Sequence, residues 1–472
     1  MNFIEKFIST VSPIYGLKRL QAIQAANHLR KFEGASKTKR TTYWNTDGNS
    51  VNTENEPALK DLRERSRDLV RNNPYASRSL DVLCSNIIGE GIIPQSKHQS
   101  ETVQLKIEEL WYWWGETTRC DFYGQHDFYG LQSLITRTVL ESGEALIRIV
   151  VSPENEFVPL KLQVLEPDFI NTDAKAIGSN YVISGKEFDK SGKCVAIHLF
   201  EEHPGGKVTG KELKSIRVPS DQVLHVLRIK RPGQVRGIPV LSPVVIRLRD
   251  YDDFLDAILM KQKISACFAA FIRKTDSISE TTTLYEKIEP GSFQYLNPGE
   301  DVTIANPPGV EGIDIFSRNI LQSIAVGIGI TYEALTGDYG NVNFSSGRMG
   351  WIEFHRNIKQ WRSDVIVPQL LNPVWEQFIK FASIKNGDIS GGEVTWTAPR
   401  REMIDPTKEV EANKSAVESL QTSLSEVIRE QGKDPIKVFE EISKEREQLK
   451  NLGISIVSNS QKGVSINENQ NN

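Results

Sequence analysis

Cysteine and histidine are scarce in this 472-residue chain, with four and seven residues in all. The cysteines stand far apart and form no CxxC pair, which argues against a disulfide framework and favours free thiols in a reducing compartment: Cys84, Cys120, Cys194 and Cys267. No HExxH motif occurs, and no set of histidines and cysteines has the spacing of a zinc site. We therefore expect neither a metal centre nor a cofactor.

Long apolar runs are also missing. No stretch approaches the ~18 consecutive apolar residues of a membrane span, and the first residues contain no apolar run long enough for a signal peptide. These absences predict a soluble protein that is made and kept inside the cell, without contact to a membrane.

The common catalytic motifs are absent as well. Every Gly-Lys pair is followed by a residue other than Ser or Thr, so the chain has no P-loop. There is no GxSxG elbow, and the nearest histidine to Ser345 and Ser346 is His355, one helical stretch away. A crowd of aspartates leaves two interpretations open, a cation site or a solvated helix face that pairs with nearby basic residues: Asp250, Asp252, Asp253 and Asp256. None of these patterns predicts an enzyme.

Charge is nearly balanced over the chain but not along it. There are 57 basic and 61 acidic residues, a net charge of −4, which disfavours a protein that grips nucleic acid over its whole surface. The first fifty residues are basic, with eight lysines and arginines against three acidic residues. They are read either as a solvated arm or as an arm that docks on a partner or on nucleic acid.

Hydrophobic periodicity predicts helices on both sides of a β-rich block. Residues 56–90 and 128–143 have helical spacing, with four arginines on the outer side of the first helix: Arg63, Arg65, Arg67 and Arg71. The tryptophans of 102–120 indicate core or interface. Between 144 and 230 the period changes to two, which predicts several strands.

The second half is predicted to be mainly helical. Helices are expected over about 242–271 and 317–329, and a third over 348–381 that Pro368 interrupts. A hairpin is expected between 293–296 and 302–304, joined by Asn297-Pro-Gly299. Residues 337–347 read as a polar, Gly-rich loop, which suits either a mobile surface loop or contact with a sliding polyanion.

An ordered series of motifs resembles the lambda-family portal proteins of tailed bacteriophages over about residues 20–450. Its members include Arg65-Ser-Arg-Asp-Leu-Val-Arg-Asn-Asn-Pro-Tyr75, Glu141-Ser-Gly-Glu144, Gln163-Val-Leu-Glu-Pro-Asp168, Arg231-Pro-Gly-Gln-Val-Arg-Gly-Ile-Pro239 and Leu335-Thr-Gly-Asp-Tyr-Gly-Asn-Val-Asn-Phe-Ser-Ser346. Each motif alone is weak, whereas the ordered set is specific.

The resemblance implies an α+β portal fold of wing, stem, clip and crown, assembled as a cyclic ring around a central channel. It implies the following divisions: a basic arm at 1–55, a wing at 56–241, stem helices at 242–274 and 313–336, a clip at 275–312, a tunnel loop at 337–347, a long helix returning to the wing at 348–398, a crown at 399–457 and a disordered tail at 458–472.

The same resemblance implies a role and partners. Such a ring, usually a dodecamer, stands at one capsid vertex of the virion, is assembled in the host cytoplasm, and passes double-stranded DNA in packaging and ejection. Its partners would be the terminase large subunit, the major capsid protein and head-completion or adaptor proteins. Tunnel-loop candidates are Tyr339, Asn341, Asn343, Ser345, Ser346 and Arg348, and clip candidates for docking are Phe293, Tyr295, Asn297, Glu300 and Asp301.

Two alternatives of other classes remain at this point. A monomeric capsid-assembly adaptor or scaffold would share the soluble, mixed composition. A hydrolase or nuclease would need the aspartates of 250–256 or other carboxylates to act together. The solution mass separates the first alternative from a ring, and substitution of the aspartates tests the second.

Overall fold

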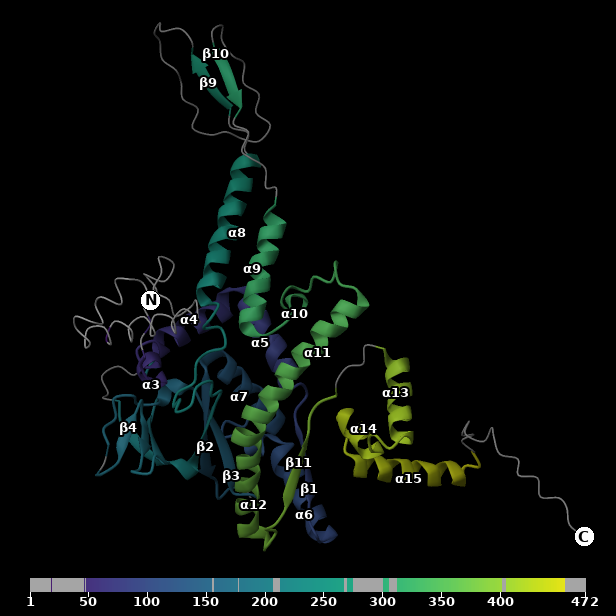
Figure 1. Ribbon diagram of the computed structural model, residues 1–472. Helices are drawn as coiled ribbons and strands as arrows, with labels where there is room; N and C mark the ends of the chain where they lie inside the picture. Colours follow the sequence, from purple (N-terminus) through teal and green to yellow (C-terminus); the bar gives the residue numbers. More distant parts are fainter. Residues whose placement is uncertain are drawn as a thin grey trace, which may run out of the picture. The chain divides into compact units, whose positions relative to one another are not determined.

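A computed structural model describes residues 18, 46, 48–154, 157–176, 178–206, 213–266, 270–274, 300–304, 312–400 and 405–454, with backbone alone for 264–266, 270–274 and 300–304 (Figure 1). The chain divides into two compact units, Met1–Glu54 and Asn55–Asn472. Helix α3 (Val51–Asn55) closes the first unit, and most of the arm expected at 1–55 lies outside the described residues. The second unit mixes helices and sheets, so the α+β fold class is confirmed.

Four helices open the second unit, namely α4 (Leu59–Asn72), α5 (Pro74–Ile87), α6 (Glu101–Gly115) and α7 (Phe128–Ser142). The break between α4 and α5 falls at Asn73-Pro74, and both residues favour the start of a new helix. The Asn73 side chain accepts a hydrogen bond from Ala76 N at 2.8 Å, and proline at the first helical position needs no amide partner. Asn73 Nδ2 also donates to Asp252 at 2.8 Å, which ties this corner to a helix far along the chain.

The tryptophans of α6 are core residues. Trp111 packs in T-shaped or tilted contacts against aromatic rings of α7, α12 (Asn372–Asn386) and β11 (Glu393–Thr397), with centroids 5.0–6.4 Å apart: Phe128, Trp375, Phe378 and Trp396. Trp114 is fully buried and donates its indole N–H to Leu160 O at 2.7 Å. This packing confirms the core interpretation for Trp111 and Trp114.

The expected β-rich block forms two antiparallel sheets. The first has the order β3-β2-β8, from Leu160–Leu165, Glu144–Val151 and Val223–Leu227. The second has the order β4-β5-β6-β7, from Tyr181–Ile183, Lys186–Phe188, Cys194–Phe200 and Ser215–Pro219. Alternation along β2 sends Ala145, Ile147 and Ile149 into the large core, whereas Leu146 enters a smaller core that includes Ile197 and Leu199 of β6.

Two long helices, α8 (Val245–Ala266) and α9 (Ile313–Ile328), run antiparallel and in contact (Figure 1). The Phe254 and Phe316 rings lie 4.9 Å apart, and a Cβ on Gly327 would overlap the Val244 side chain. The helix predicted to reach about 271 ends at Ala266, because β-strand β9 (Ala270–Lys274) follows. Its antiparallel partner is β10 (Glu300–Ile304). The partner expected for 302–304, residues 293–296, lies outside the described residues.

The third long helix begins earlier than predicted and is interrupted as predicted. After α10 (Tyr332–Thr336), helix α11 (Phe344–Trp361) passes into a π-helical segment, Arg362–Leu371, that contains Pro368. Helix α12 then continues to Asn386. A proline lacks the amide of the ordinary i→i−4 ladder, and a wider helical turn accommodates it.

Strand β11 pairs antiparallel with β1 (Ile93–Lys97), so the chain returns to the region of the first helices. Three shorter helices end the described chain, α13 (Pro406–Glu418), α14 (Leu424–Glu430) and α15 (Pro435–Asn451). The tail expected at 458–472 lies outside the described residues. In the part of the chain that the structure describes, no helix combines the length and apolarity needed to cross a membrane.

Candidate functional site

The polar segment after α10 is an exposed loop held by its own hydrogen bonds. Gly337 ends α10 with φ of 73°, a left-handed conformation that glycine adopts freely. Asp338 Oδ1 accepts from Gly340 N at 3.0 Å, and Val342 N donates to Tyr339 O at 3.2 Å. The Tyr339 side chain is 65% exposed, and Asn341 is exposed as well. The loop therefore offers an aromatic ring and amides in a fixed turn.

Helix α11 starts inside the predicted loop, which corrects the boundary drawn at Arg348. Asn343 is the N-cap, since its side chain accepts from Ser346 N at 2.9 Å while Ser346 Oγ accepts from Asn343 N at 3.2 Å. This reciprocal capping box satisfies two amides that the first turn would leave open. Ser345, Ser346 and Arg348 consequently project from the first turns of a helix, and all three are exposed.

The basic residues that follow are not equivalent. Arg356 and Lys359 are exposed on α11. Arg362 instead donates through Nε to Ile87 O at 2.7 Å and through Nη2 to Asn86 O at 2.8 Å. These bonds anchor the end of α11 to α5, so Arg362 has a structural role, unlike the exposed Arg356 and Lys359.

The clip candidates are only partly visible. Phe293, Tyr295 and Asn297 lie outside the described residues. Glu300 and Asp301 belong to β10, where they stand opposite Lys274 and Arg273 of β9.

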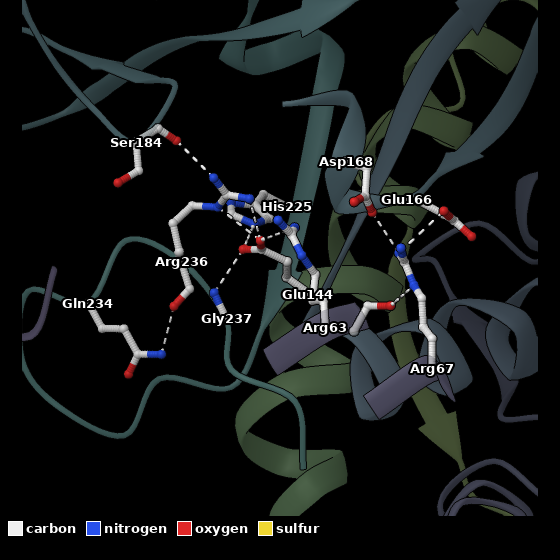
Figure 2. Close-up of polar contacts among 11 residues, drawn as sticks. Arg63, Arg67, Glu144, Glu166, Asp168, Ser184, His225, Gln234, Arg236 and Gly237 are labelled. Carbon is white, nitrogen blue, oxygen red and sulfur yellow. Dashed lines mark hydrogen bonds and ion pairs between the residues drawn. The ribbon is translucent and has the colours of Figure 1, made fainter. Parts of the chain in front are cut away.

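Sequence reasoning missed a buried ion-pair cluster around Glu144, at the start of β2 (Figure 2). Glu144 is fully buried. Arg236 donates to its Oε1 through Nε at 2.9 Å and Nη2 at 2.6 Å, and Gly237 N donates to Oε2 at 2.8 Å. Arg63 Nη1 lies 3.6 Å from Oε1, and His225 Nε2 lies 2.9 Å from Oε2. One carboxylate thus joins α4, β2, β8 and the loop before α8.

Two glycines make this approach possible. Gly143 ends α7 with φ of 91°, and a Cβ there would overlap the backbone of Gly237 and Ile238. A Cβ on Gly237 would in turn overlap Gly143 O. The two glycines therefore let the chain segments meet backbone to backbone, which places the Gly237 amide against the Glu144 carboxylate.

Electrostatics fix the protonation of the cluster. Burial alone would raise the pKa of Glu144, but attraction to Arg236 and the hydrogen bond from His225 lower it far below its usual value. Burial and then the charge of Lys186 lower the pKa of His225 to about 4. Lys186 Nζ lies 3.0 Å from His225 Nδ1, so a neutral imidazole accepts from Lys186 and donates from Nε2 to Glu144.

A second group of acidic residues surrounds Arg67. Its Nη2 lies 2.6 Å from Asp168 and 3.3 Å from Glu166 (Figure 2). His203 Nε2 lies 3.2 Å from Glu166. Glu166, Asp168 and His203 are close enough together to hold a metal ion. The guanidinium already occupies the position between the two carboxylates, so the group is an ion-pair network around Arg67.

Two aspartates of α8, Asp252 and Asp253, have different partners and do not bind a common group. Asp252 accepts from Asn73, as described above, and Asp253 pairs with Arg249 at 3.5 Å along the helix. The pairing of Asp253 is the helical-neighbour arrangement that the sequence left as one of two interpretations.

The missed residues were partly visible in the sequence. Arg63 was predicted on the outer side of its helix, and that prediction is wrong, because Arg63 is 7% exposed. It follows Leu59 by four residues and precedes Val70 by seven, so it lies on the apolar face by the same spacing. Glu144 and Arg236 stand within two motifs quoted above, but nothing in one sequence says that they pair.

The matching family model is described as "Phage portal protein, lambda family" and spans residues 37–362. The chain belongs to the lambda family of phage portal proteins. This portal chain is 27% identical over 463 residues to the "Probable portal protein" of Halomonas phage phiHAP-1, covering 90% of this chain and 88% of that protein. It is 19% identical over 471 residues to "Portal protein B" of Escherichia phage lambda, covering 87% and 88%.

Among solved structures, the portal chain is similar to a chain of the "Virion of native gene transfer agent (GTA) particle". The TM-score is 0.47 at 16% identity, covering 78% of this chain and 92% of that one.

Proposed function

We propose that this portal chain forms a closed ring at one vertex of a phage capsid, and that double-stranded DNA passes through the ring during packaging and ejection. Membership of the portal family carries this proposal. The ring has no catalytic role of its own: it serves as the conduit, assembled in the host cytoplasm and retained in the virion.

The domain assignment belongs to the same proposal. The wing comprises α4 to α7 with the two sheets, and α8 and α9 are the stem helices. The strands β9 and β10 belong to the clip, where the terminase large subunit and later the head-completion or adaptor proteins dock. Helices α13 to α15 form the crown, and the major capsid protein surrounds the ring.

We assign DNA contact to the exposed segment 339–348. Its side chains are mostly neutral, and only Arg348 adds a positive charge: Tyr339, Asn341, Asn343, Ser345, Ser346 and Arg348. Neutral donors and acceptors contact phosphates weakly, whereas clustered lysines and arginines would hold the duplex through counterion release. A loop of this kind suits DNA that has to slide.

The anchoring of α11 supports this assignment. The capping box fixes the start of the helix, and Arg362 fixes its end to α5. A force on the loop is therefore transmitted along α11 to its end at α5, which suits a channel element that resists moving DNA.

The test is DNA packaging by capsids that carry variant portals. Deletion of 339–341 shortens the loop but keeps the capping box, and Arg348→Glu reverses the charge beside it. Both variants are expected to form rings and to package or retain less DNA. Arg356→Glu, an exposed arginine two turns further along α11, is the matched control and is expected to package normally. Normal packaging by both loop variants would refute the assignment.

A further inference from the structure

Helices α8 and α9, the proposed stem pair, each carry a row of exposed residues, here called a stripe. The two stripes lie at the same height, meaning the same position along the helix axes. On α8 the stripe consists of Ile246, Arg249, Asp253 and Ala257, and on α9 it consists of Val326, Gln322, Asn319 and Ile315. Successive members are three or four residues apart, so each stripe follows one side of its helix. Ile246 is 71% exposed and Val326 is 80% exposed, so each stripe has an apolar side chain open to solvent at the end nearest the body of the chain.

Contacts within the chain fix the relative heights. At the end where α9 finishes, Gly327 packs on Val244, and near the middle of α8 Phe254 packs on Phe316. These two contacts fix which residues of the two helices lie side by side. Because the helices are antiparallel with the same rise per residue, Ile246 lies level with Val326. The remaining pairs are then also level, namely Arg249 with Gln322, Asp253 with Asn319, and Ala257 with Ile315.

The chemistry matches at each height. At each end of the stripes, an apolar residue of α8 is level with an apolar residue of α9. In the middle, the exposed Arg249–Asp253 ion pair stands level with two amides, and an amide both donates and accepts. The α9 stripe carries no charge over its four members, so another helix would cover it without burying an unpaired ion.

In a cyclic ring, residues that touch across the interface between two copies must lie at the same height along the ring axis. Rotation about the ring axis moves no residue along that axis, and each copy meets its two neighbours through two different faces. With the stem pair along the axis, residues that touch across an interface have the same height. A stripe on α8 and a level, complementary stripe on α9 meet this requirement of equal height.

We propose that the α8 stripe of each copy packs on the α9 stripe of the next copy, with Ile246 against Val326 and Asp253 against Asn319. This inference rests on the proposed ring and adds the register in which its copies meet. At the foot of this contact, Val326 also borders a cavity of about 960 Å³ between α9 and α11, so the neighbouring copy reaches the edge of that cavity.

Paired cysteines test the register in the full chain. Two variants, Ile246→Cys with Val326→Cys and Asp253→Cys with Asn319→Cys, each place thiols at one height. The matched control, Ile246→Cys with Ile315→Cys, places them about 16 Å apart along the helices, at 1.5 Å per residue. The wild-type chain, treated in the same way with a short bismaleimide, gives the background from its own four cysteines.

Both level pairs are expected to give a denaturing-gel ladder from dimer up to the full ring, and the control is expected to stay at background. Native mass of the same samples shows whether rings form at all, which separates a failure of the proposed register from a failure of the proposed ring. If rings form but level pairs do not link, or the control links as strongly, the register is wrong. If no variant and no wild-type chain forms rings, the proposed ring itself fails.

Discussion

Replacing Glu144 by glutamine is expected to destabilise the fold severely, because one buried carboxylate balances several cations. The new amide oxygen would still accept from Gly237 N, but Arg236 and Arg63 would lose their counter-charge while 2% and 7% exposed. Breaking a buried ion pair by removing one partner costs about 3–5 kcal/mol. The upper part of that range applies here, since the carboxylate accepts two bonds from Arg236 and one from His225.

The assay is thermal unfolding followed by tryptophan fluorescence, which reports on the aromatic core around Trp111 and Trp114. At roughly 2–4 °C per kcal/mol for a large domain, a loss of about 4–5 kcal/mol corresponds to a fall in Tm of about 8–20 °C. Glu141→Gln makes the same chemical change three residues earlier at a half-buried position, where the cost is expected to stay near 1 kcal/mol. Equal melting temperatures for the two variants would refute the reasoning.

Two further perturbations follow from the same geometry. The folded-state pKa of His225 is about 4 against 6.5 for the free side chain, so the unfolded chain binds the extra proton first and stability falls as the pH drops from about 6.5 towards 4. His225→Gln is expected to flatten that part of the curve of melting temperature against pH, and an unchanged slope would contradict it. Asn343→Ala removes the N-cap of α11 at a cost of about 1 kcal/mol, so amide hydrogen exchange at Ser346 and Gly347 should quicken roughly five-fold, while Asn341→Ala in the same loop leaves it unchanged.

Much of the fold could be predicted because its signals are local. The alternation of 144–230 and the interruption at Pro368 each act within a few residues, and each appears where expected. The start of α11 was misplaced because two serines and Gly347 resemble a loop. The decisive signal was the reciprocal bond between Asn343 and Ser346, which is also local and legible as a capping box.

The buried cluster could not be predicted in the same way. Arg63, Glu144 and Arg236 are separated by 81 and 92 residues, and only the tertiary fold brings them to one carboxylate. Arg63 was predicted on the outer side of α4 because an arginine is usually exposed, although its spacing from Leu59 and Val70 puts it on the apolar face. The level match of α8 and α9 is likewise set by contacts of Gly327 and Phe316, which one sequence does not show.

The central claim is that this chain assembles into a portal ring. Negative-stain electron microscopy of the purified full chain, with native mass on the same sample, tests that claim most directly. The account predicts rings with a central hole and a mass that is a whole-number multiple of the chain mass. A homogeneous monomer in the purified sample, which remains a monomer when it is assembled together with the major capsid protein, would contradict it.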